Sequence, residues 1–375
     1  MFERIEVEGG PRERGREYGE AARDRVHRSV EVYGEAFAHY AGWDRARVRE
    51  EAGRSIAPVA AFEPRYLEEI RGLAEGAGLD ELDVLAINVR TEIMYSAMAR
   101  AQRPAECTSF AVVPSRAAAA TLLVAQNWDW LPHALDTTII LEARQDEGPD
   151  YVTVVEAGLL AKVGMNSSGV AVGANALVTA ADVGTPGVPF HVLLRALHDA
   201  HTLADAMASL ARMPRSSSAN YLLGHEDGLA VDVEAAPGGV GQLYPGYPDD
   251  GVIVHANHFI NPGFDECDVA PAVMPDSVPR LMRARQMVAD HPGPVDRAFL
   301  EAVLADHAGH PFSVCCHPDP RVPAVEQSMS VAGVIMEPAN RRLWITEGNP
   351  CTAPFELLDY GELLSKPSPL RVTVG

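Results

Sequence analysis

The chain has 375 residues, of which 47% are hydrophobic and 22% are charged, a composition typical of a folded globular enzyme. It carries 31 basic and 52 acidic residues, so its formal net charge is −21 at pH 7. A chain this acidic repels nucleic acid and anionic membranes, and we exclude both as main partners.

The sequence also predicts neither a targeting segment nor a set of disulfides. No apolar run approaches the roughly 20 residues of a membrane span. The start of the chain, residues 1–6, lacks the basic and apolar stretches of a signal peptide, so we expect a cytoplasmic protein. The five cysteines are odd in number and form no CxxC pair, which argues against a disulfide framework.

Residues 1–100 are predicted to be helical. Apolar residues recur there every three or four positions on one helix face, at Val26, Val30, Tyr33, Phe37 and Tyr40. Two more helices are expected around residues 67–74 and 82–93, separated by glycines. Residues 100–106 contain Pro104 and several charges without any period, and they are expected to form an exposed linker.

After the linker the pattern changes to short runs rich in β-formers. Strands are predicted near residues 110–113, 121–125, 137–141, 151–155, 161–163, 170–172, 221–223, 230–233, 252–254, 331–336 and 341–346. Helices are predicted within 189–212, broken near 200–202, and at 278–290 and 295–306. Runs of strands that alternate with paired helices indicate an α+β fold, in which helices cover packed antiparallel sheets.

Cys107 opens a predicted strand directly after the linker. It is either a small buried residue at a strand start or a reactive thiol. A cysteine nucleophile usually takes a histidine as its base. If the chain were cut before Cys107, the new α-amino group, with a reference pKa of about 7.7–8, would serve as the base instead.

Three polar residues at predicted strand ends are further candidates. Asp129 stands between two tryptophans and either orients a nucleophile or amine, or is a turn carboxylate beside core aromatics. Asn175 and Asn257 either donate N–H groups to an oxyanion or form turns.

A second cluster of histidine and cysteine lies within residues 306–317. Its composition suits zinc, with the ligands His307, His310, Cys315 and His317. No CxxC pair is present, however, and His307 and His310 sit across a Gly-Pro break. The alternative is a helix end followed by a strand with a buried cysteine and surface histidines.

Several short segments between residues 88 and 346 are informative when they are considered together, in the order in which they occur along the chain. They are Asn88–Glu92, Cys107–Ser109, Gln126–Trp130, Glu156–Gly158, Lys162–Val172, Asn175–Leu177, Val254–His258 and Pro311–Cys315. Together they resemble the acyl-coenzyme A:6-aminopenicillanic-acid acyltransferase family (isopenicillin N acyltransferase-like), which belongs to the N-terminal nucleophile hydrolases. The resemblance implies a four-layer αββα sandwich with a helical N-terminal segment, one compact domain made as a precursor.

In such a family the nucleophile cleaves its own chain. Here Cys107 would attack the carbonyl of Glu106 and give an α chain, residues 1–106, and a β chain, residues 107–375, which stay associated. By the same resemblance Cys107 is the nucleophile and its amine the base, while Asp129 orients that amine or assists maturation. Asn257 would donate to the oxyanion, with Asn175 near the site. The residues implied to bind substrate are Arg90, which would pair with a carboxylate, Thr108 and Ser109.

The sequence departs from relatives at three places. Glu106 stands where fungal members have Gly, and Glu326–Ser328 replace a fungal Ser-Arg pair. Gln126 stands where related bile-salt hydrolases carry Arg. The side chain of Glu106 would slow chain cleavage, while the other two differences argue against penicillin-like, acyl-CoA and bile-salt substrates.

We therefore expect a self-processing N-terminal cysteine amidohydrolase or acyltransferase. Its substrate would be a linear amide in an N-acyl amino acid, a small peptide or a secondary metabolite, with no metal or cofactor. Hydrolysis is favoured over transfer because nothing resembles a site for coenzyme A phosphates. The alternatives are a zinc-dependent hydrolase at the 306–317 cluster and an uncleaved, non-catalytic family member, and a homo-oligomer stays open.

Overall fold

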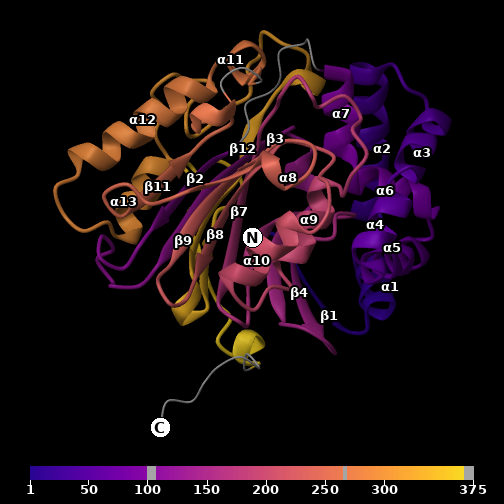
Figure 1. Cartoon of the computed structure of the whole chain (residues 1–375), viewed down its shortest axis with the longest axis horizontal. Coiled ribbons are helices and arrows are strands. Elements are labelled where there is room, and N and C mark those ends of the chain that lie inside the picture. Colours follow the sequence, from indigo (N-terminus) through magenta and orange to yellow (C-terminus); the bar gives the residue numbers. More distant parts are fainter. Residues whose placement is uncertain (99–106, 265–267, 367–375) are drawn as a thin grey trace.

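A computed structural model describes residues 1–98, 107–264 and 268–366. Its two β-sheets lie face to face between two layers of helices (Figure 1). This arrangement confirms the predicted α+β, four-layer αββα class.

The larger sheet has eight strands in the order β1-β4-β5-β6-β7-β8-β9-β10. Their bounds are β1 Glu3–Gly9, β4 Thr138–Gln145, β5 Tyr151–Glu156, β6 Val163–Asn166, β7 Val170–Ala176, β8 Ala219–His225, β9 Ala230–Ala235 and β10 Leu243–Gly246. All neighbours pair antiparallel except β1 and β4, which are parallel.

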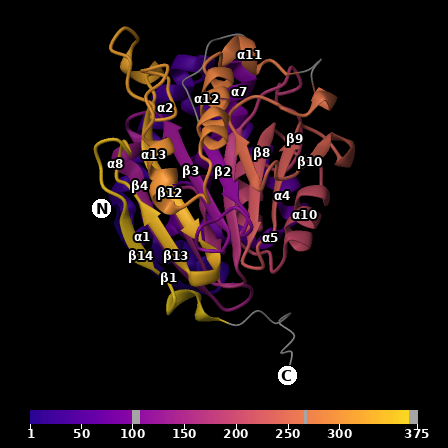
Figure 2. The same ribbon diagram turned by 90° about the vertical axis from the view of Figure 1, so that its left-hand side faces the viewer.

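The smaller sheet has six antiparallel strands in the order β11-β2-β3-β12-β13-β14. Their bounds are β11 Val252–His255, β2 Thr108–Val112, β3 Leu123–Trp130, β12 Met329–Glu337, β13 Arg342–Ile345 and β14 Glu356–Asp359. Figure 2 views this sheet from the side of the helix α12.

The helices divide between the two outer layers. Outside the larger sheet lie α1 Pro11–Ala21, α2 Arg23–Ala41, α3 Arg45–Gly53, α4 Ile56–Phe62, α5 Pro64–Ala77, α6 Glu81–Asn88, α7 Arg90–Met98, α9 Phe190–Leu197 and α10 Leu203–Ala211. The other layer contains α11 Ala270–Val273, α12 Ser277–Asp290 and α13 Arg297–Leu304, and the short α8 is Ala134–Thr137.

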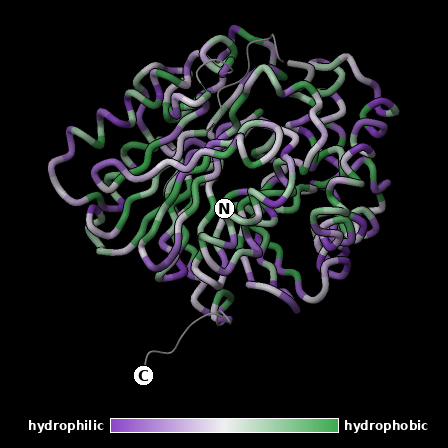
Figure 3. Tube along the Cα trace, viewed as in Figure 1, coloured by the Kyte–Doolittle hydropathy of each residue, from purple (hydrophilic) through white to green (hydrophobic). Residues whose placement is uncertain are grey.

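The apolar stripe of residues 26–40 lies on α2 as predicted, with Val26, Tyr33 and Phe37 fully buried. Such a stripe buries one face of the helix against the core. The helix expected over residues 82–93 is divided at Val89 into α6 and α7. Figure 3 shows hydrophobic residues concentrated in the strands at the centre, while the outer helices carry more hydrophilic ones.

The prediction that residues 1–100 are helical is wrong for the first nine. Strand β1 pairs residue by residue with β4, from Glu3 opposite Ile139 to Gly9 opposite Gln145. Ile5 and Val7 are buried, while Glu6 between them and Glu8 after them are exposed. This period of two is the strand signal that the search for a helical stripe missed.

Among the described residues, the structure has no helix long and apolar enough to cross a membrane.

Candidate active site

Cys107 lies at the entrance to the space between the two sheets, directly before β2. It is 3% exposed and lines a small cavity. The other walls of this cavity come from α7, β3, β7, α9 and the segment before β6, through Arg90, Thr91, Trp130, Lys162, Ala174, Ala176, Phe190 and His191. The thiol therefore sits where residues from both sheets and two helices meet.

The backbone carbonyl of Cys107 is held by two side-chain donors. Asn175 Nδ2 donates to it at 3.1 Å and an Arg280 guanidinium nitrogen donates at 2.9 Å. The same Arg280 nitrogen also donates to Thr108 Oγ1 at 3.0 Å. These bonds fix the position of the backbone that carries the thiol.

Asn175 is itself oriented by its neighbours. Its Oδ1 accepts from Ser109 Oγ at 2.7 Å and from Asn220 Nδ2 at 3.2 Å, so its Nδ2 points to Cys107. Because Asn175 belongs to β7 and Ser109 to β2, the hydrogen bond between them joins the two sheets.

Asn257 follows β11 and is buried beside the same arginine. Its Oδ1 accepts from Arg280 at 2.8 Å, and its Nδ2 donates to the carbonyl of Ala176 at 2.9 Å. Arg280 is anchored in turn by Asp276 one helical turn earlier, at 2.8 Å. The structure thus brings Cys107, Asn175 and Asn257 together around a buried cation that sequence reasoning had not singled out.

Asp129 lies near the end of β3 and is fully buried. Ser330 Oγ donates to its Oδ1 at 2.6 Å. The negative charge of Asp129 raises the pKa of Arg280, and together with burial it raises the pKa of the Cys316 thiol. Asp129 is therefore part of the same electrostatic environment as Arg280.

Arg90 lines the cavity, and its charge is matched within the protein. It forms a fully buried ion pair with Glu156 at 2.5 Å and lies over the rings of Tyr33 and Trp130. Burial alone would raise the pKa of Glu156, but Arg90 and His133 lower it below its ordinary value. The carboxylate predicted to pair with Arg90 is thus found in the protein itself.

Sequence reasoning did not identify Lys162 or His191 as site residues. Lys162 Nζ lies 4.7 Å from the centre of the Trp128 ring, and Arg90 Nε donates to His191 Nε2 at 3.2 Å. Burial and the charges of Arg90 and Lys162 hold the pKa of His191 well below 6.5, so this ring is neutral at pH 7. A usable signal existed, because Lys162 is one of only two lysines in the chain.

The remaining predicted positions have structural partners or lie outside the described residues. Thr108 and Ser109 are fully buried and hydrogen-bond to Arg280 and Asn175. Gln126 exchanges two hydrogen bonds with the backbone of Ala174, at 2.6 and 2.9 Å, which joins β3 to β7. The predicted cleavage residue, Glu106, and the linker over 100–106 lie outside the described residues.

A buried network of acids and a histidine lies behind Asn175. Asn220 Nδ2 donates to Asp232 at 2.6 Å, and His255 Nε2 lies 2.8 Å from Glu234 and 3.8 Å from Asp232. Burial would lower the pKa of His255, but the two carboxylates outweigh it and raise the pKa above 6.5. This charge network stabilises the strands that position Asn175.

The zinc alternative named four residues, and the structure brings three of them together. His307, Cys315 and His317 do converge, but their fourth neighbour is Cys351, not His310. The chain turns at Gly309, where φ is +94°, and His310 contacts the group only through its ring, 5.2 Å from that of His317.

The most apolar of the larger hollows does not contain Cys107. It lies between α2, α3 and α6, has a volume of about 480 Å³, and is lined by residues that include Tyr33, Phe37, Trp43 and Ile87. We place the candidate site at Cys107 because the oriented polar groups converge there.

Comparisons with known proteins identify the family of the chain. A family model described as acyl-coenzyme A:6-aminopenicillanic acid acyl-transferase matches residues 116–352, more than half of the chain. The chain is 27% identical over 313 residues, 83% of its own length and 84% of the other, to the acyl-coenzyme A:6-aminopenicillanic-acid-acyltransferase 40 kDa form of Emericella nidulans.

Two solved structures are similar at lower identity. Penicillin V acylase from Agrobacterium tumefaciens matches with 16% identity and a TM-score of 0.46, over 69% of this chain and 88% of that one. A variant of conjugated bile acid hydrolase from Clostridium perfringens matches with 10% identity and a TM-score of 0.45, over 69% of this chain and 94% of that one.

Proposed function

Because the chain belongs to the acyl-coenzyme A:6-aminopenicillanic acid acyltransferase family, we propose that it is a self-processing amidohydrolase or acyltransferase whose nucleophile is Cys107. The observation that carries the proposal is the pair of bonds from Asn175 and Arg280 to the Cys107 carbonyl. A nucleophile works best when its backbone is held in advance of reaction, and these donors do this from two different layers.

The first step would be maturation. Sγ of Cys107 attacks the carbonyl carbon of Glu106, the Glu106–Cys107 peptide bond breaks, and the freed nitrogen takes a proton and becomes an α-amine. Water then hydrolyses the thioester, which restores the thiol and releases the carboxylate of Glu106. The new amine can accept the thiol proton in the next reaction, because its pKa lies close to working pH.

Turnover would use the same thiol on a substrate amide. The thiolate attacks the substrate carbonyl, the amine leaves with a proton from the α-ammonium group, and a thioester on Cys107 remains. Asn257 would donate an N–H to the developing oxyanion, since Arg280 fixes its Oδ1 and so orients the amide group. Asp129 would orient the α-amine, and Asn175 would hold the nucleophile.

Substrate recognition is proposed for the cavity beside Cys107. Arg90, Thr108 and Ser109 would shape it, although each has partners within the protein. Lys162 lines the same cavity and would contribute a positive charge to the recognition of a negative substrate group. The substrate class is a linear amide of an N-acyl amino acid, small peptide or secondary metabolite, and water is the favoured acceptor.

The two pieces would remain associated after cleavage. Strand β1, before the cut, pairs with β4, after it. Glu156 of β5 accepts from Tyr33 of α2 at 2.8 and 2.9 Å and pairs with Arg90 of α7. The cytoplasmic location is kept in the proposal, because the four described cysteines are free thiols.

The test is the intact mass of the purified protein under denaturing conditions. Cleavage predicts fragments of about 11 and about 29 kDa, the larger beginning at Cys107, in place of one chain of 40.3 kDa. A single 40.3 kDa species whose Cys107 resists an alkylating reagent would support the uncleaved, non-catalytic alternative instead.

A second experiment addresses the reaction itself. Cleaved protein is incubated with a panel of N-acyl amino acid amides, with and without hydroxylamine, and products are followed by mass spectrometry. An acyl thioester would be intercepted as a hydroxamate, in proportion to hydroxylamine. Free acid alone at every hydroxylamine concentration would argue against a thioester open to amines.

A further inference from the structure

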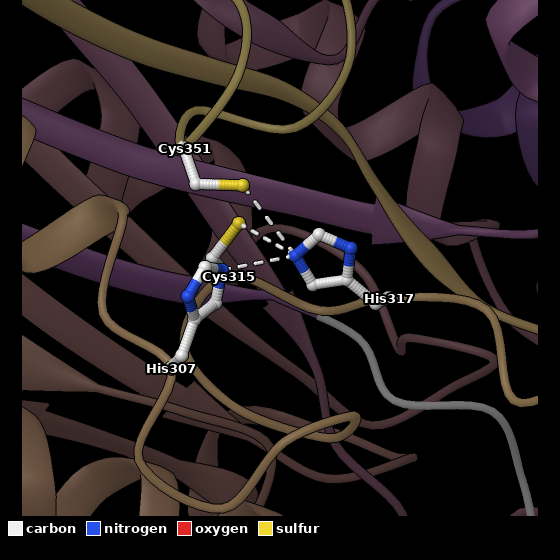
Figure 4. A group of neighbouring side chains, drawn as sticks. All are labelled: His307, Cys315, His317 and Cys351. Atoms are coloured by element: carbon white, nitrogen blue, oxygen red, sulfur yellow. Dashed lines mark hydrogen bonds between the residues drawn. The ribbon is translucent and has the colours of Figure 1, made fainter.

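Four metal-binding side chains meet away from Cys107, at the edge of the smaller sheet (Figure 4). His307 follows α13, Cys315 and His317 lie in the segment between α13 and β12, and Cys351 follows β13. Their four ligand atoms all lie within 4.8 Å of one another. Segments far apart in sequence thus converge on one point.

Three distances within this group are close to those of a tetrahedral metal site. His317 Nε2 lies 3.0 Å from His307 Nε2, 3.5 Å from Cys315 Sγ and 3.5 Å from Cys351 Sγ. A tetrahedral zinc ion with bonds of ~2.3 Å to sulfur and ~2.0 Å to nitrogen separates its ligands by about 3.5 Å for N–S and about 3.3 Å for N–N. The side chains are therefore close to the positions that an ion at their centre requires.

We propose that His307, Cys315, His317 and Cys351 bind one Zn²⁺ ion as a structural site. A set of two cysteines and two histidines binds zinc in preference to hard cations. On binding, each thiol loses its proton to solvent, so that two thiolates neutralise the ion. Four protein ligands leave no position for a catalytic water, and the site is distinct from the zinc hydrolase considered above.

The surroundings of Cys315 support a bound thiolate. Cys315 is fully buried, and Asn349 Nδ2 donates to its Sγ at 3.5 Å. Donors aimed at a sulfur stabilise its charged form and orient it toward a metal.

The position of the site suggests its role. The neighbouring Cys316 forms two hydrogen bonds with Ser330: the Cys316 N–H donates to Ser330 Oγ at 2.9 Å, and the Ser330 N–H donates to the Cys316 carbonyl at 2.9 Å. Ser330 Oγ is also the donor to Asp129. A metal ion would fix residues 315–317 and the turn at 349–352, and through them the strand that supports Asp129.

The experiment uses the full chain purified without a metal-affinity step. Zinc content is measured by mass spectrometry of the metal, and Co²⁺ substitution is followed by absorption. We expect about one zinc per chain and a Co²⁺ spectrum with thiolate charge-transfer and tetrahedral d–d bands. Removal of the zinc by a chelator should lower Tm by about 5 °C.

Variants locate the site. Cys351→Ser and His307→Ala change residues near the surface, and each should lower zinc affinity at least 10-fold. His310→Ala is the matched control, because its imidazole is adjacent but outside the ligand set, and it should keep the zinc.

Three results would overturn the proposal. The first is a wild-type protein that binds Zn²⁺ no more tightly than His307→Ala does in a titration. The second is equal loss of zinc in His310→Ala. The third is a native Cys315–Cys351 disulfide, seen as a chain that is lighter by two hydrogens before reduction. None of these depends on the proposed function, because the readouts are metal content, spectrum and mass.

Discussion

Cys107 and Cys315 are both buried cysteines, yet the groups around them contact different atoms. Around Cys107 two oriented side-chain donors reach the backbone carbonyl, and the residue lines a small cavity. Around Cys315 the donors and ligand atoms reach the sulfur itself. The comparison teaches that the direction of the neighbouring groups, more than burial, distinguishes the surroundings of the proposed nucleophile from those of the proposed metal ligand.

The largest effect is expected when the proposed nucleophile of the Cys107 region is replaced. Cys107→Ala should abolish both chain cleavage and amide turnover, a loss of about 10³-fold or more, because among the described residues no other thiol lines the cavity. Intact mass and product formation measure this. Cys107→Ser should keep slow cleavage, and His310→Ala should behave as wild type. A fully active Cys107→Ala protein would remove Cys107 from the mechanism.

The next effect tests the cation that holds the first region together. Arg280→Met leaves Asp276 without its partner and removes the bonds to Cys107 and Asn257. We expect a loss of about 3 kcal/mol in the free energy of unfolding, measured with urea, since removal of one member of a buried pair is costly.

Arg283→Met, on the same helix, is the matched control. Arg283 pairs with Asp306 near the surface, so its loss should be clearly smaller. If Arg280→Met does not fold, Arg280→Lys should fold with reduced turnover. Equal unfolding energies for the wild type and Arg280→Met would show that the buried bonds do not stabilise the site.

A carboxylate that acts in chemistry should affect turnover more than folding. Asp129→Asn keeps the shape and the bond from Ser330 but removes the charge, so we expect kcat to fall about 100-fold, with little change in unfolding. Ser330→Ala, which removes only the bond, should have the smaller effect on kcat. Wild-type rates in Asp129→Asn would exclude the residue from the site.

The smallest expected effect is a pH dependence of the free energy of unfolding, caused by a histidine near the Cys107 region. His198 is fully buried behind Lys162, with its Nε2 3.2 Å from the Lys162 carbonyl, and burial lowers its pKa from 6.5 to about 4. In the unfolded chain His198 is protonated below about pH 6.5, whereas in the folded chain it is protonated only below about pH 4. Protons therefore favour the unfolded chain, and the free energy of unfolding falls as the pH falls between these two values.

Between pH 7 and 5 this contribution amounts to about 2 kcal/mol. Urea unfolding at both values should therefore show a larger acid loss in wild type than in His198→Gln. Parallel losses in the two proteins would mean that other groups set the acid sensitivity.

Much of the fold was predictable because the apolar periods are local. The stripe on α2 and the alternation within the strands are read from neighbouring residues, and the order of elements then implies two covered sheets. Strand β1 was missed because seven residues at the edge of a helical segment give a weak signal, and its pairing with β4 lies more than 130 residues away.

Residues of the candidate site could be predicted only where they belong to a recognisable sequence motif. Cys107, Asn175 and Asn257 were expected together and do meet around one group. Arg280 was missed because nothing in its helix distinguishes a buried arginine from an exposed one such as Arg283. Cys351 was missed because it lies 34 residues beyond His317, so that sequence proximity favoured His310.

If the chain is cut as proposed, the pairing of β1 with β4 has one more consequence. An intact chain unfolds in a single-molecule transition, whereas two pieces separate when they unfold and must find each other again. The cleaved protein therefore becomes a heterodimer in the thermodynamic sense, and its unfolding midpoint should rise with protein concentration, while that of an uncleaved variant should not. The seven-residue register of β1 on β4 then acts as a subunit interface.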